Sequence, residues 1–177
     1  MHLRKLATGI RGKKPIVPFF VVAAAAFVLL AAAAAAPAQS AGKQAEVWTQ
    51  SSIEKGFAGM AGAAKSTGIA GSILGRYEGH IVELSSRTAS GQVEVHQHFV
   101  DIIVVTKGQA TLLTGGTVLG KKEEADGEER GTSMRGGVKH SISAGDLVHI
   151  PAGLPHQMLL QPGTLFEAEI VKVRVAK

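Results

Sequence analysis

Two histidines separated by one residue, His96 and His98, are the first residues in the sequence that could carry chemistry. They lie in the stretch VEVHQHFVDIIVV, which is rich in residues typical of β-strands. Because side chains at i and i+2 of a strand leave the same face, we expect both imidazoles and the carboxylate of Glu94 on one side. Such a pair can share a metal ion, but it also fits two polar residues on a solvated strand face.

A third imidazole that could complete a metal site belongs to His156, in the stretch GDLVHIPAGLPHQMLL. Pro151 and Pro155 stiffen the backbone before it, and Gly153 allows a turn. A metal site holds its ligands at about 2 Å from the ion, so a rigid approach suits a ligand. The chain has no cysteine, so any metal must be held by imidazole, carboxylate or main-chain oxygen.

The other polar candidates have simpler interpretations. His140 and His149 fit packing or surface positions on strands, and His80 fits a structural role. Glu94 could be an acid or base in a pocket, although an exposed carboxylate on a strand face is the alternative.

The formal charge of +5 does not indicate nucleic-acid binding, because the positive excess lies in the first 38 residues. Five of the 19 basic residues lie there with no acidic residue, which leaves 14 basic against 14 acidic residues in the remainder. No basic stripe is left to follow a phosphate backbone, so we expect no nucleic-acid partner.

Residues 1–38 have the pattern of an export signal peptide. A cationic head, MHLRKLATGIRGKK, is followed by an apolar run from Pro15 to Ala36 and by small residues up to Ala38. We expect cleavage after Ala38, which would make the protein periplasmic or secreted and leave no other contact with a membrane. An uncleaved membrane anchor is the alternative, because the apolar run is long enough to span a bilayer.

The remainder divides into an N-terminal segment at 39–76 and a barrel domain at 77–177. In the first, residues 39–50 read as a tether, 51–65 as a short helix capped by Ser51 or Ser52, and 66–76 as a loop. In the second, short segments rich in Val, Ile and Thr predict strands. These segments are 80–87, 92–98, 101–108, 109–116, 138–143, 146–153, 156–163 and 164–175.

Strands without intervening helices predict an all-β fold, an antiparallel sandwich or barrel. The charged, glycine-rich tract at 118–137 is expected to be a solvated hairpin loop, with a functional lid as the alternative. The segment 164–175 is a plausible edge strand for a homodimer.

Two motifs give the chain a resemblance to small single-domain cupins. The first cupin motif has a glycine, an HxH pair, a carboxylate and a second glycine, here Gly91, His96, His98, Asp101 and Gly108. The second has a glycine, P-x-G, a histidine and usually an asparagine, here Gly145, Pro151, Gly153, His156 and, in place of asparagine, Leu160. The resemblance covers about residues 77–175 and extends to a group of exported bacterial cupin-domain proteins.

This resemblance implies a jelly-roll barrel with a divalent metal (Fe, Mn, Ni, Cu or Zn) bound by His96, His98 and His156. Asp101 stands where cupins usually have glutamate and is one methylene shorter. It would bind the ion directly, bind it through water, or orient a histidine.

Three functions remain open from the sequence. One is a metal-dependent enzyme of dioxygenase, isomerase or lyase type that acts on a small organic molecule. The second is a barrel that binds a metal or small ligand without turnover, and the third is a barrel whose histidines bind no metal. Fold alone does not separate them, because cupins host many unrelated activities.

Overall fold

A computed structural model describes residues 44–175 of the chain, which form one helix followed by strands. The helix is α1 (Gln50–Thr67), and a short 3-10 turn, η1 (Ala125–Gly127), lies between β7 and β8. The strands are β1 (Ile69–Arg76), β2 (His80–Arg87), β3 (Val93–His96), β4 (Phe99–Lys107), β5 (Gln109–Thr114), β6 (Thr117–Leu119), β7 (Lys122–Glu123), β8 (Glu128–Gly131), β9 (Ser133–Arg135), β10 (Val138–Ser143), β11 (Leu147–Ile150), β12 (His156–Leu159) and β13 (Phe166–Arg174).

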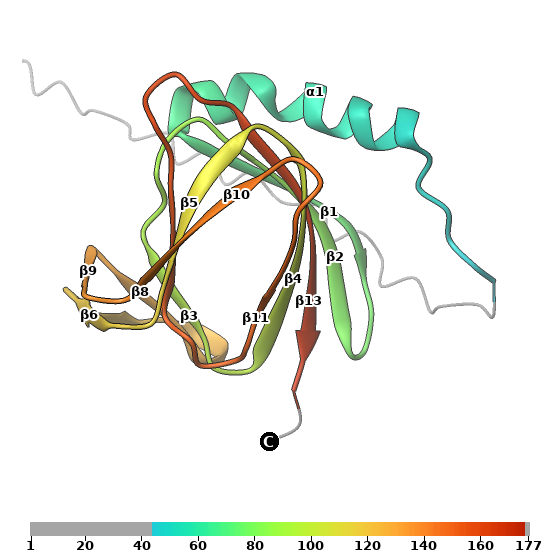
Figure 1. Cartoon of the computed structure of the whole chain (residues 1–177). Coiled ribbons are helices and arrows are strands. Elements are labelled where there is room, and N and C mark those ends of the chain that lie inside the picture. The colour runs from blue at the N-terminus through green and yellow to red at the C-terminus, as the bar shows by residue number, and fades with distance from the viewer. Residues whose placement is uncertain (1–43, 176–177) are drawn as a thin grey trace, which may run out of the picture. The chain divides into compact units, whose positions relative to one another are not determined.

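Two antiparallel sheets face each other and form the barrel (Figure 1). One sheet has the order β1-β2-β13-β4-β11, the other the order β10-β5-β12-β3-β8-β7, and β6 pairs with β9 separately. A buried apolar cluster from both sheets lies between them, and it includes Ile103, Leu112, Ile142, Met158 and Phe166. The prediction of an all-β barrel is therefore confirmed.

The helix α1 covers the outer face of the first sheet, next to β1 and β2 (Figure 1). Phe57 and Met60 are buried against Leu84 of β2, which is fully buried. The helix begins after Thr49, whose side chain accepts a hydrogen bond from the backbone N–H of Ser52. The expected cap at Ser51 or Ser52 was thus wrong, because the helix starts slightly earlier than its serines suggest.

Two expectations about strands were wrong, each for its own reason. Residues 69–76, expected to be a loop, form β1, which pairs with β2 from Ile69↔Arg87 to Arg76↔Ile81. Its glycines hide the alternation of exposed and half-buried positions that the strand has. Strand β13 is not an edge, since β2 and β4 pair with its two sides. A homodimer stays a prediction, but this strand does not supply an open edge for it.

The charged tract at 118–137 is also more ordered than a solvated loop. It contains the end of β6 and all of β7, β8 and β9, and β8 pairs with β3 from Val93↔Gly131 to His96↔Glu128. The charges of this tract led to the wrong expectation because several of the charged side chains face the barrel interior, as described below.

The predicted signal at 1–38 lies outside the described residues. In the part of the chain that the structure does describe, no helix has the length and apolar character needed to cross a membrane.

The turn between β4 and β5 gives a test of the fold. Gly108 has φ of +78°, and a Cβ there would overlap the carbonyl oxygen of Leu165. We expect Gly108→Ala to lower the free energy of unfolding by about 2 kcal/mol or more, measured by urea denaturation. Gly59→Ala is the control, because this exposed position inside α1 has open space around it and alanine favours helix there. Equal stability of the two variants would contradict the steric role of Gly108.

Candidate metal centre

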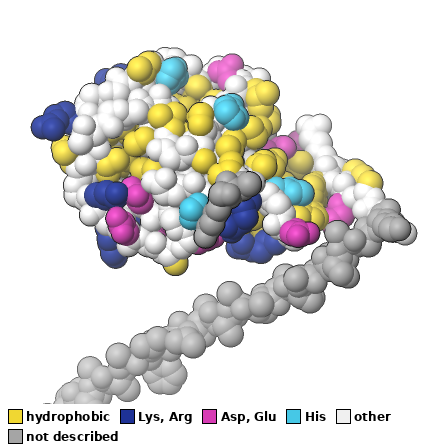
Figure 2. Space-filling model, turned by 90° about the horizontal axis from the view of Figure 1, so that it is seen from below, with side chains coloured by type: hydrophobic (Ala, Val, Ile, Leu, Met, Phe, Trp, Pro, Cys, Tyr) yellow, Lys and Arg dark blue, Asp and Glu magenta, His cyan; other side chains and the backbone are white. Residues whose placement is uncertain are grey.

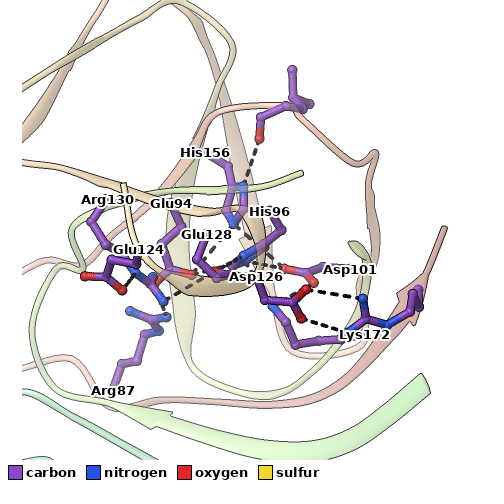
Figure 3. Close-up of polar contacts among 12 residues, drawn as sticks. Arg87, Glu94, His96, Asp101, Glu124, Asp126, Glu128, Arg130, His156 and Lys172 are labelled. Atoms are coloured by element: carbon purple, nitrogen blue, oxygen red, sulfur yellow. Dashed lines mark hydrogen bonds and ion pairs between the residues drawn. The ribbon is translucent and has the colours of Figure 1, made fainter. Parts of the chain in front are cut away.

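Three possible ligands meet in the barrel interior: Glu94, His96 and His156 (Figure 3). Glu94 and His96 are two residues apart on β3, so their side chains leave the same face, and His156 of β12 is the register partner of Glu94. One ligand atom from each lies within 4.8 Å of the others. Both histidines are buried, with 3% and 6% of their surface exposed. The pairing of β3 with β12 therefore places the three possible ligands next to one another.

The distances within this group suit a metal ion. The Nε2 atom of His96 lies 3.5 Å from Oε2 of Glu94, and the Nε2 atom of His156 lies 3.9 Å from the same oxygen. Ligand atoms that each sit about 2 Å from one ion are separated by roughly 3–4 Å. Two imidazoles and one carboxylate are also a donor set that transition metals accept. The group could therefore bind a metal ion.

His98 is not part of this group. Strand β3 ends at His96, and residues 97 and 98 form a turn into β4, so the two histidines do not share a strand face. The ring of His98 lies instead beside Gly127 at the end of η1. The expectation from i and i+2 spacing was wrong because the spacing rule holds only while the strand continues.

Asp101 does lie in the cavity with the two histidines that meet there. This buried residue has Oδ2 at 3.3 Å from Nε2 of His96 and at 3.8 Å from Nε2 of His156. Its other oxygen, Oδ1, accepts a hydrogen bond from Nζ of Lys172 at 3.0 Å. The same Nζ lies 3.0 Å from Nε2 of His96. An ammonium group thus stands close to the atoms that an ion would use.

The outer nitrogens of both imidazoles are held by the protein. Nδ1 of His96 lies 2.5 Å from Oε2 of Glu128, and Nδ1 of His156 lies 3.0 Å from the carbonyl oxygen of Leu154. With Nδ1 as donor in each contact, both Nε2 atoms point to the interior. Partners of this kind fix the orientation of histidine ligands in metal sites.

Glu94 is held by two arginines (Figure 3). Arg130 of β8 places Nη1 2.7 Å from Oε1 of Glu94, and Arg87 of β2 places Nη2 3.5 Å from the same oxygen. Burial disfavours the ionised carboxyl, but the hydrogen bond with His96 and the two guanidinium groups outweigh it and lower the pKa of Glu94. The carboxylate is ionised at neutral pH, and its Oε2 faces the two imidazoles.

The charges around His96 favour its protonated form when no ion is bound. Burial alone would lower the pKa of His96, but hydrogen bonds to Asp101, Glu128 and Glu94 raise it to about 10. For Asp101 burial acts in the opposite direction, and the contacts with His96 and Lys172 still lower its pKa. Burial lowers the pKa of His156, which is neutral at pH 7. Protonated His96 and Lys172 together balance the carboxylates.

The group lines a cavity of about 440 Å³ between the two sheets. Its basic lining residues are Arg76, Arg87, Arg130, Lys172 and Arg174. Its acidic lining residues are Glu83, Glu94, Asp101, Asp126 and Glu128. The formal charges of these side chains cancel. On the outer face in Figure 2, acidic and basic side chains also lie among one another rather than in patches of one sign.

Sequence reasoning missed several residues of this cavity. Lys172 and Ile170 are two residues apart on β13, and Glu128 and Arg130 are two residues apart on β8, so each pair shares one strand face. This spacing was the available signal in the sequence. Alternation alone does not show which face is inside. The remaining histidines match their structural interpretations: His80 stacks on Tyr77, His140 lies 3.0 Å from the hydroxyl of Thr114, and His149 is exposed.

Comparisons with known proteins give structural similarity only. Neither a protein-family model nor a curated protein matches the chain. Among solved structures, BH2720 from Bacillus halodurans is 15% identical over 77% of this chain and 86% of that chain, with a TM-score of 0.49. A Cupin 2 conserved barrel domain protein from Salinispora arenicola is 18% identical over 59% and 75% of the chains, with a TM-score of 0.41.

The polyketide cyclase RemF from Streptomyces resistomycificus is also similar in structure. It is 15% identical, covers 62% of this chain and 69% of its own, and has a TM-score of 0.44. The fold of this chain is described by its own strand pairing, the pair of facing antiparallel sheets given above. The two facing antiparallel sheets of this chain form a small barrel.

Proposed function

We propose that the protein binds one divalent transition metal ion through His96, His156 and Glu94, and that a small organic ligand enters the same cavity. The observation that carries this proposal is the convergence of the three ligand atoms within 4.8 Å. Glu94 takes the place that the family resemblance gave to His98. Asp101, close to both imidazoles, is either a fourth residue that binds the metal ion or a base that accepts a proton from the small organic molecule.

A metal ion in this position would act as a Lewis acid toward ligand oxygen atoms. The chain itself supplies groups that move protons. Lys172 can donate a proton and Asp101 can accept one, and the two are already joined at 3.0 Å. Among the reaction types expected from the sequence, this pair favours isomerase or lyase chemistry. A barrel without turnover is the alternative function.

The site of action proposed for the protein rests on the sequence alone. The signal pattern at 1–38 would direct it to the periplasm or the medium, where a small molecule would be its partner.

Metal binding is tested by substituting the possible ligands one at a time. We expect His96→Ala, His156→Ala and Glu94→Gln each to weaken binding of Zn(II) by more than about 100-fold, because each removes one of three donors. His98→Ala is the matched control and should bind as the wild type does. Binding is measured by isothermal titration calorimetry and elemental analysis on protein without a histidine tag. A loss in His98→Ala equal to that in His96→Ala would contradict this ligand set.

The position of Lys172 generates a second prediction. Its ammonium lies 3.0 Å from Nε2 of His96, so its positive charge opposes an ion bound to that nitrogen. We expect Lys172→Met to tighten Zn(II) binding by about tenfold or more. Lys107→Met removes a mostly exposed lysine and should leave the affinity unchanged. Equal affinity in both variants would show that Lys172 does not compete with the ion.

The raised pKa of His96 predicts how metal binding depends on pH. Without an ion, the imidazole keeps its proton up to a pKa of about 10, so the ion must displace that proton. Affinity should therefore rise with pH, by about tenfold per unit between pH 7 and 9. Titration calorimetry in buffers of different ionisation enthalpy should show release of about one proton. An affinity that does not change over this range would contradict protonation of His96.

A further inference from the structure

The wall of the cavity opposite the ligand strands carries an acidic side chain, Glu83, that has no hydrogen bond or ion pair with any group in residues 44–175. Glu83, Ser85 and Arg87 occupy every second position along β2, so they share one face of the strand, and all three line the cavity. Their register partners on β13 are Ile170, Ala168 and Phe166, which are apolar. Neighbours of this kind give Glu83 no hydrogen-bonding partner from the adjacent strand.

Among the described residues, no hydrogen bond or ion pair joins the carboxyl group of Glu83 to another side chain or to the backbone. Burial raises its pKa, and the charges that act on it come from Lys172 and Asp101, then Glu94 and Arg76. A partly buried carboxyl group without a partner costs stability. Nothing in the metal group described above uses Glu83, so its position requires another explanation.

The net charge of the cavity indicates what kind of molecule could bind at this wall. The formal charges of its acidic and basic side chains cancel, so an ion bound as proposed above would leave the cavity with an excess of two positive charges. Guest molecules with a negative charge would reduce this excess. Arg87, whose side chain is 12% exposed, offers further N–H donors next to Glu94.

We propose that the cavity binds a small hydroxycarboxylate, whose carboxylate faces the metal ion and Arg87 and whose hydroxyl group donates a hydrogen bond to Glu83. The hydroxyl of Ser85 lies next along the same wall and is a second polar contact. The ligand class rests on the proposed metal site, whereas the role of Glu83 as an unsatisfied acceptor does not.

The test compares two acids that differ by one hydroxyl group, lactate and propionate. On the Zn(II)-loaded full chain, we expect Glu83→Met to weaken lactate binding by about tenfold and to leave propionate binding unchanged, measured by calorimetry. Glu169→Met is the matched control, since Glu169 lies on the opposite face of the same sheet and lines the groove beside α1. Equal loss for both acids, no loss for either, or no binding of either acid to the wild type would overturn the proposed ligand class.

A second measurement needs neither metal nor ligand. If Glu83 is kept for a ligand, replacing its unsatisfied carboxyl group by a thioether of similar size should raise the thermal midpoint of the metal-free protein by a few degrees. A lower midpoint than that of Glu169→Met would show that Glu83 supports the fold, which would overturn its role as an acceptor. Failure of the metal site would appear separately, as absence of Zn(II) binding by the wild type.

Discussion

The structure depends on how the barrel interior compensates the charge of His96. Its imidazole lies within hydrogen-bonding or ion-pair distance of the carboxylates of Glu94, Asp101 and Glu128, and Lys172 approaches the same ring. Charged groups are costly to bury unless each has partners. The surrounding strands, β3, β4, β8 and β13, each contribute one of these charges, so correct pairing of all four is required to complete the cluster. Fold and site are therefore specified together.

A metal ion and Lys172 offer two solutions to the same electrostatic problem. Without an ion, the surrounding carboxylates raise the pKa of His96, and its protonated form together with the ammonium of Lys172 would balance the buried carboxylates. A divalent ion would supply comparable positive charge at Nε2 of both histidines, and the proton and ammonium would then be in excess. Affinity at such a site is set by competition among these cations as much as by the geometry of the ligands. Lys172 thus belongs to any account of selectivity at this centre.

The sequence predicted the parts of this protein that follow short, uninterrupted patterns. Strand-like segments and turn residues indicated the barrel, and the histidines of the two motifs indicated two of the three group members, His96 and His156. The pattern failed where an element ended without a clear signal, as between His96 and His98. It failed also in β1, whose glycines obscure its alternation, and in the tract that contains β8. Lys172 could not be assigned to the site because strand alternation does not tell the inner face from the outer one.

The three proposed metal ligands and the polar groups that face them belong to different sheets. Glu94, His96 and His156 are carried by the sheet that contains β3 and β12, whereas Glu83, Asp101 and Lys172 are carried by the sheet that contains β2, β4 and β13. The distance between these two sets is set by the apolar layer between the sheets, which includes Leu112 and Phe166. Close packing transmits changes of a single methylene through such a layer. Substitutions in the apolar layer would therefore alter the geometry of the proposed metal site, although these residues lie outside the site itself.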